Sequence, residues 1–305
     1  MSLRQIPFDS INQDNMKLFF QYIAQRHEIY KKRLSNMPPP WTSDKILQQY
    51  KFTNVFRDLD PGTRYVIDNI IPKCDSAEKV IFNITIYRLF NKIETFEAVG
   101  IQDPQFKKKE FEIKIRELKS SGVKVFTNAF IVSGYSNIKG EDKIEKVTNI
   151  ISEISSSISA LADEIARKKD SEFTFLKIKS LQGIGNFLAY QICVDIGYWD
   201  KDLYDESTHV VCGPGCKRGL DRIFIRIKDY EECIRYLEEM QEKEFRKKGI
   251  DMDELFSDRK IKRLNLMSIE NCLCEFSKYM KALNKEGRPR NRYRTIQHDP
   301  YNVNR

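Results

Sequence analysis

The stretch that decides the fold is LQGIGNFLAYQICVD, residues 181–195. Gly183 and Gly185 bracket one apolar residue, Ile184, and an amphipathic segment begins at Asn186. Glycine permits a positive φ and lets another backbone come close. The first amides of the following helix have no intrahelical partners and lie at its positive end, where a phosphate fits. The pattern predicts either a hairpin that holds a DNA backbone, with Gly183, Gly185 and Asn186 as contacts, or an ordinary tight turn between two helices.

The helix expected after the hairpin adds two candidate catalytic residues. Phe187, Gln191 and Asp195 lie four residues apart, so they share one face of that helix. Asp195 comes near the C-terminal end, where the helix dipole disfavours a negative charge. We therefore expect another group to interact with the Asp195 carboxylate. This group is either a reacting group, which makes Gln191 and Asp195 catalytic, or the partner in a local hydrogen bond or salt bridge.

Outward from this stretch, apolar residues recur at helical spacing over most of the chain, which predicts a mainly α fold. Residues 123–132 fit either a short strand or a buried helix, and there is no alternation of strands and helices. We expect an N-terminal segment over 1–14, a helical domain over 15–283 that can divide into two lobes near 133–140, and a loose basic tail over 284–305. Helices are expected over residues 16–34, 61–71, 77–98, 105–119, 142–169, 172–180, 186–196, 215–224, 230–247 and 268–283, with a short one, capped by Thr42 or Ser43, ending at Tyr50.

Composition narrows the function classes only slightly. The 305 residues carry 52 Lys+Arg against 44 Asp+Glu, a net charge of +8 that weakly favours a polyanionic partner. The seven cysteines are irregularly spaced, and no signal peptide or membrane span is evident, so we expect an intracellular protein with reduced thiols, in a nucleus or viral replication compartment if eukaryotic and otherwise in the cytoplasm. The motifs G-x-x-x-x-G-K-[ST] and G-x-S-x-G are both absent, which argues against a P-loop kinase and an α/β-hydrolase.

A second anion site is expected downstream, in STHVVCGPGCKRGLDRIF, residues 207–224. The turn at 213–215 is followed by Lys217 and Arg218 in the first turn of the next expected helix. Basic side chains beside helix amides favour phosphate binding. His209, Cys212 and Cys216 suggest zinc, but a fourth ligand at suitable spacing is missing. We therefore predict no metal site and no cofactor.

The expected hairpin, followed by a polar segment containing THV, resembles the helical DNA glycosylase superfamily, and it implies that fold. In those enzymes a catalytic Asp follows the second hairpin glycine, and Asp205 takes that position here. Bifunctional glycosylases carry a lysine just after the hairpin, where this chain has Asn186 and Phe187. A C-terminal iron–sulfur cysteine cluster is also absent. The sequence thus departs from the lyase-type enzymes.

Four motifs in order give a closer resemblance, covering roughly residues 19–276. They resemble the α-glutamyl/putrescinyl thymine pyrophosphorylase family, also known as the helical domain associated with 5-hydroxymethyluracil DNA kinases. The resemblance implies thymine hypermodification, in which a flipped 5-(pyrophosphoryloxymethyl)uracil base in DNA exchanges its pyrophosphate for an amine. DNA and an amine co-substrate are the implied partners. The motifs are YIAQRHEIYKKR (22–33), PPPWTSDKILQQYKFTNVFRDLD (38–60), LQGIGNFLAYQICVD (181–195) and GPGCKRGLDRIF (213–224).

That resemblance gives each candidate residue a role. Guanidinium groups match phosphate oxygens, a histidine titrates near neutrality, and an amide can read a base edge. The alternatives are ion pairs between helices, caps, and core packing. We expect Arg26, Asn54, Arg57, Gln191 and Asp195 to converge on one pocket near the hairpin. The roles are pyrophosphate binding for Arg26, Arg57 and Arg218, the base for His27, uracil reading for Asn54, stacking for Trp41 or Phe52, amine orientation for Asp195 or Asp60, and backbone contact for Lys217.

Two other functions fit the same sequence. A DNA glycosylase that hydrolyses an N-glycosidic bond would place Asp205 at a base-sized pocket. A non-catalytic helical protein, binding DNA or serving as a structural subunit, would use the hairpin and the basic tail for phosphate contacts alone.

Overall fold

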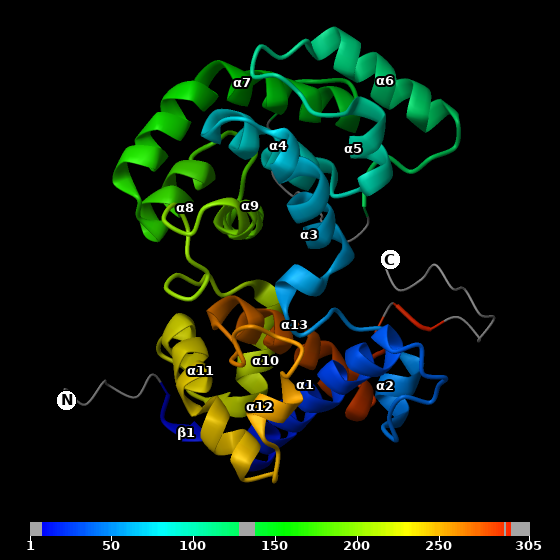
Figure 1. Cartoon of the computed structure of the whole chain (residues 1–305), viewed down its shortest axis with the longest axis vertical. Helices are drawn as coiled ribbons and strands as arrows, with labels where there is room; N and C mark the ends of the chain where they lie inside the picture. Colours follow the sequence, from blue (N-terminus) through cyan, green and yellow to red (C-terminus); the bar gives the residue numbers. More distant parts are fainter. Residues whose placement is uncertain (1–7, 128–137, 290, 294–305) are drawn as a thin grey trace. The chain divides into compact units, whose positions relative to one another are not determined.

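The computed structural model describes residues 8–127, 138–289 and 291–293. They form thirteen α-helices and one small antiparallel sheet, which confirms the mainly α fold (Figure 1). The chain folds into two compact units. Unit 1 contains residues 1–61 and 212–305, and unit 2 contains residues 62–211. The division near 133–140 that the sequence suggested lies mostly outside the described residues.

Unit 1 is assembled from both ends of the chain. Its core joins aromatic rings of α1 to the C-terminal helix, with Phe19 against Phe276 at 5.3 Å between ring centroids. Helices α10 and α13 pack so closely that a Cβ added at Gly219 would lie 2.3 Å from the carbonyl oxygen of Leu273. Its elements are β1 (Ser10–Ile11), α1 (Gln13–Leu34), α2 (Lys45–Gln49), η1 (Arg57–Leu59), α10 (Pro214–Ile223), β2 (Phe224–Ile225), α11 (Tyr230–Arg246), α12 (Met252–Leu255) and α13 (Leu266–Leu283).

Unit 2 is built around α4, whose residues 80–90 are all buried. Helices α7 and α9 pack against α4 (Figure 1). Helix α9 is likewise buried over residues 188–196, and Asp195 is its single charged residue. The elements of unit 2 are α3 (Pro61–Tyr65), which starts at the boundary, the π-helical η2 (Val66–Ile70), η3 (Ile71–Lys73), α4 (Ala77–Phe90), α5 (Ile93–Val99), α6 (Lys108–Ser120), α7 (Lys143–Lys168), α8 (Ser171–Lys179) and α9 (Asn186–Trp199).

Several boundaries differ from the sequence prediction. The long helix expected over 77–98 is two helices, because Asn91 adopts φ 49° and ends α4 in a left-handed cap. Helix α2 is capped by Asp44, whose Oδ1 accepts from the amides of Ile46 and Leu47, and not by Thr42 or Ser43. Among the described residues of the tail, Arg292 forms a β-bridge with Tyr50, and the carbonyl oxygen of Asn291 accepts from the Lys51 amide at 2.9 Å.

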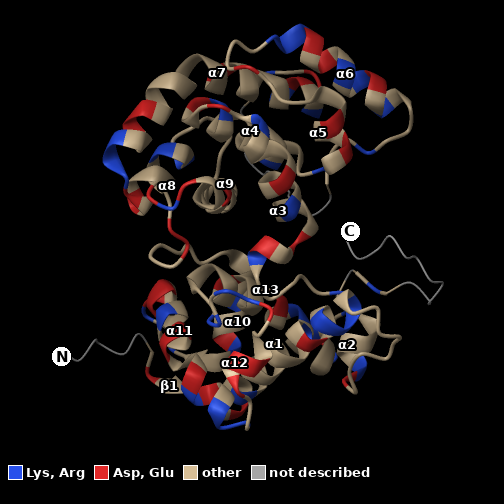
Figure 2. Cartoon of the chain, viewed as in Figure 1, with Lys and Arg blue, Asp and Glu red and all other residues tan. Residues whose placement is uncertain are grey.

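Charges of both signs are mixed along the surface helices. Lysine and arginine alternate with acidic residues on α6 and α11 (Figure 2). Within the described residues, no helix is long and apolar enough to cross a membrane.

Candidate functional site

The hairpin of unit 2 consists of α8, a four-residue turn and α9. The amide of Ile184 donates to the carbonyl oxygen of Leu181 at 3.1 Å, and Gly183, third in this turn, has φ 76°. A positive φ at that position favours glycine. A Cβ at Gly183 would also lie 2.5 Å from Cδ1 of Ile150. Ile184 is buried, so Gly183 and Ile184 serve the fold of the turn itself.

At position 185, by contrast, no contact within the protein requires a glycine. Its φ of −84° and ψ of 172° suit any residue, and an added Cβ would meet no atom within 4 Å. It is the N-cap of α9, and the first intrahelical bond runs from the Ala189 amide to its carbonyl oxygen at 2.9 Å. Gly185 and Asn186 are both exposed. The positive end of α9 is therefore open to a group that approaches closely from outside.

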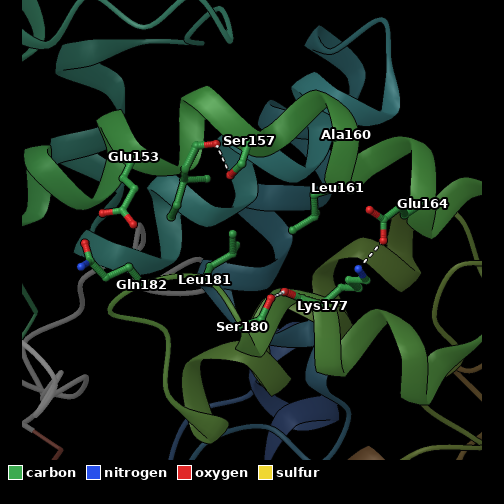
Figure 3. A pocket seen from close by; sticks show the side chains of 10 residues that line it. Glu153, Ser157, Ala160, Leu161, Glu164, Lys177, Ser180, Leu181 and Gln182 are labelled. Carbon is green, nitrogen blue, oxygen red and sulfur yellow. Dashed lines mark hydrogen bonds and ion pairs between the residues drawn. The ribbon is translucent and has the colours of Figure 1, made fainter.

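A pocket of about 280 Å³ lies on the other side of the turn, between α7 and the end of α8 (Figure 3). Glu153 and Gln182 line one end, and the ion pair between Glu164 and Lys177 lines the other. Leu161 and Leu181 contribute apolar surface. Two carboxylates against one lysine repel a phosphate, so the open N-terminus of α9 is the better place for one.

Asp195 forms a buried ion pair in unit 2. Its carboxylate accepts from Nε of Arg88 at 2.5 Å and from Nη2 at 2.7 Å. Thr63 and Asn91 accept the remaining bonds of this guanidinium. Burial lowers the pKa of Arg88, but the adjacent Asp195 raises it more, above the ordinary value. Asp195 thus has a salt-bridge partner, and Gln191, one turn earlier, is buried as well.

A second polar cluster lies in unit 1, where α1 meets the segment before α3. Nη2 of Arg26 donates to the carbonyl oxygen of Phe52 at 2.8 Å and to Oδ1 of Asn54 at 2.9 Å. The carboxylate of Asp60 accepts from the backbone amide of Asn54 at 2.9 Å and from Nη1 of Arg57 at 3.1 Å. The structure thus brings Arg26, Asn54 and Arg57 together, joined by Asp60.

The amide and aromatic candidates of this region are engaged in the fold. Nδ2 of Asn54 donates to the Leu59 carbonyl, so both ends of its amide are in use. Phe52 is buried, with its ring 5.7 Å from that of Tyr22. Trp41 is partly exposed, and its Nε1 donates to the Met37 carbonyl. The side chains of Asn54 and Phe52 are therefore engaged by the fold, whereas Trp41 keeps part of its surface exposed.

His27 is fully buried on α1. Its Nε2 lies 2.8 Å from Oδ1 of Asp258, and the rings of Phe56 and Phe256 pack around it. Burial lowers the pKa of His27 below its ordinary value, although Asp258 opposes that effect. Burial thus disfavours the charged imidazolium, and the Asp258 carboxylate is placed to accept a hydrogen bond from Nε2.

The expected phosphate site before α10 is already occupied by carboxylates. Oε1 of Glu231 accepts from the Cys212 amide at 3.0 Å, and Oε1 of Glu270 accepts from the Gly213 amide at 3.2 Å. Lys217 and Arg218 are exposed in the first turn, and Lys217 stacks on Tyr230. Negative groups on these amides oppose a phosphate there.

Glu270 is a residue that the sequence interpretation missed. It lies on α13 with 6% of its surface exposed, and burial raises its pKa to about 7, against the effect of the Gly213 amide and Arg57. A carboxyl group that titrates near neutrality suits acid–base chemistry. The available signal was an acidic residue within the apolar run SIENCLCEF, residues 268–276.

The remaining candidates hold local structure. Oδ1 of Asp205 accepts from the Ser207 amide at 2.8 Å, closing a turn, and Asp205 does not line the pocket of Figure 3. His209 is hydrogen bonded to Tyr204 in unit 2, whereas Cys212 and Cys216 belong to unit 1. Of the five residues expected to converge, Arg26, Asn54 and Arg57 belong to unit 1, and Gln191 and Asp195 to unit 2.

Comparisons with known proteins place the whole helical region in one group. Residues 13–288 match the sequence model of the family described as 5-hmdU DNA kinase, helical domain. A curated relative, the 5-hmdU DNA kinase of Bacillus phage SP10, is 27% identical over 289 residues, which cover 86% of this chain and 44% of that protein. The chain thus spans less than half the length of this relative. No solved structure matches.

Proposed function

The chain belongs to the 5-hmdU DNA kinase helical-domain family, and from this premise we propose that it modifies a 5-hydroxymethyluracil-derived base in DNA. In the proposed reaction, an amine displaces pyrophosphate from the 5-(pyrophosphoryloxymethyl) group of that base. The product is an aminated thymine that remains part of the DNA strand.

The observation that carries the DNA part of the proposal is Gly185. Its conformation and surroundings accept a side chain, so the benefit of glycine lies in what approaches from outside. A DNA phosphate that bonds to the first amides of α9 needs the space that a Cβ would fill. The exposed Asn186 next to it adds a donor for the same phosphate.

The cluster of unit 1 supports the leaving-group part. Nε and Nη1 of Arg26 are buried and have no hydrogen-bond partner among the described residues. Two such donors in a partly dry environment favour an anion strongly. Arg57 adds a second guanidinium beside Asp60. Since the chain contains no P-loop motif, displacement of a phosphoryl-activated group fits it better than phosphoryl transfer from a nucleotide.

The direct test is a base-exchange assay. A duplex with a single 5-(pyrophosphoryloxymethyl)uracil is incubated with the full chain and a panel of primary amines, and the nucleosides are then analysed by mass spectrometry. We expect a nucleoside of aminated mass together with one equivalent of pyrophosphate. Release of a free base would instead indicate a glycosylase, and an unchanged duplex with every amine would contradict the proposal.

Gly185→Ala is expected to separate DNA binding from stability. The Cβ blocks the approach of a phosphate, so affinity for duplex DNA should fall at least about tenfold, since hydrogen bonds to charged groups contribute about 1.5–3 kcal/mol. The free energy of unfolding should change by less than about 1 kcal/mol, because alanine fits the backbone and loses only N-cap preference. Fluorescence anisotropy and urea denaturation measure the two quantities.

Gly183→Ala is the matched control, because its Cβ meets Ile150 and its φ is positive. It should lower stability, and Gly185→Ala should not. If Gly185→Ala binds DNA as tightly as the natural chain across a salt titration, the hairpin is only a turn.

A further inference from the structure

Glu270 has a buried carboxyl group in which one of the two oxygens accepts no hydrogen bond among the described residues. Its Oε1 accepts from the Gly213 amide at 3.2 Å, and this is its only hydrogen bond among the described residues. Oε2 has no such donor and is not one of the fully buried unpartnered atoms. A carboxyl oxygen in this position is able to receive a proton from a bound molecule.

Glu275, on the same helix, shows what a structural carboxylate looks like here. It is equally buried, at 5% exposed, but Lys278 pairs with one oxygen and the Thr53 amide donates to the other at 3.4 Å. Both of its oxygens are therefore engaged by the fold. Glu270 differs from it in having an uncommitted oxygen and no lysine partner.

The groups around Glu270 shift its pKa in opposite directions. Arg57 on η1 favours the carboxylate, whereas burial and Glu275 favour the neutral acid. The thiols of Cys216 on α10 and of Cys272 and Cys274 on α13 also interact electrostatically with Glu270, and burial is the main cause that raises the pKa of each. These thiols are neutral at pH 7, which leaves Glu270 as the group of this cluster that exchanges protons there.

We propose that Glu270 accepts the proton released when the amine attacks, a role that rests on the proposed function. The amine nitrogen bonds to the exocyclic methylene carbon as the bond from that carbon to the pyrophosphate oxygen breaks. The leaving oxygen keeps the electron pair and stays bound to the guanidinium groups. In the same step one proton of the attacking nitrogen moves to Oε2 of Glu270, which later returns it to water. The charge of Arg57, which pairs with Asp60, also acts on this carboxyl group, so in this proposal Arg57 couples the departure of pyrophosphate to the proton transfer.

The test compares Glu270→Gln with Glu275→Gln in the base-exchange assay from pH 5.5 to 9. With the concentration of unprotonated amine held constant across this range, the natural chain should gain kcat/KM as pH rises through about 7, since the carboxylate is then ionised. Glu270→Gln should lose about 10²–10⁴-fold and lose this pH dependence, the range of general-base catalysis. Glu275→Gln should keep the pH dependence. Glu270→Gln should be at least as stable as the natural chain at pH 8, because an amide resembles the neutral acid that burial favours.

A second measurement does not depend on activity. With [5-¹³C]glutamate labelling, the carboxyl resonance that disappears in Glu270→Gln should titrate near pH 7. A resonance that titrates near 4.5, or a Glu270→Gln variant with natural rate and pH profile, would overturn the role of Glu270 while the proposed function stands. If the natural chain transfers no amine at any pH, the proposed function fails, and this role fails with it.

Discussion

Asp195→Asn is expected to lower the free energy of unfolding by about 3–5 kcal/mol, because it leaves the buried charge of Arg88 without its partner. Arg88 is 1% exposed, and its guanidinium donates two hydrogen bonds to this carboxylate. Asparagine has nearly the same shape, so the loss comes from charge and hydrogen bonding. Urea denaturation of the full chain measures it, with hydrogen exchange to locate the effect in unit 2.

The double variant Arg88→Met with Asp195→Leu serves as its control. Replacing both members of a buried ion pair by apolar residues of similar volume is often neutral or stabilising. The double variant should therefore recover most of the stability that Asp195→Asn loses. A different result would favour the catalytic role: if Asp195→Asn keeps the natural stability and abolishes base exchange, its carboxylate serves the reaction.

Gly219→Ala is expected to destabilise unit 1 by about 1–3 kcal/mol or more, the usual cost of overpacking a well-packed core. The added Cβ would lie 2.3 Å from the carbonyl oxygen and 2.9 Å from the carbonyl carbon of Leu273. Both are backbone atoms of α13, so no side chain can move aside, and α10 must separate from α13. Thermal unfolding followed by circular dichroism measures the change.

Gly287→Ala is the matched control for that prediction. It lies in the same unit, and its Cβ would meet no atom within 4 Å. We expect an unfolding midpoint close to that of the natural chain. Equal midpoints for both variants would show that α10 and α13 tolerate separation.

The sequence predicted local structure correctly where neighbouring residues determine it. The helices at 13–34, 143–168 and 266–283 follow apolar periodicity. The turn at Gly183 follows from glycine spacing. The break at Asn91 was missed because no proline or glycine marks it, and apolar residues continue through 90.

The candidate site was less accessible to sequence reasoning, because its contacts join distant positions. Arg88 and Asp195 are 107 residues apart, and Arg88 received no role from the sequence. Glu270 reaches Gly213 across 57 residues. Arg26, Asn54 and Arg57 lie on neighbouring motifs and are joined through Asp60 in unit 1, yet the two hydrogen bonds of the Asn54 side chain follow from tertiary packing alone.

The discontinuity of unit 1 has a consequence for the order of events on the ribosome. Residues 62–211 form unit 2 as one continuous stretch, so it can fold as soon as it emerges. Helix α1 precedes unit 2 in the chain but must wait for α13, which follows unit 2, to cover its aromatic face. The Arg26–Asn54–Asp60 cluster is likewise completed only after α13 has been made, since Nδ2 of Asn271 on α13 donates to the Asn54 carbonyl. The segment before unit 2 thus depends for its burial on a helix made after unit 2, and termination of synthesis before α13 would leave it exposed.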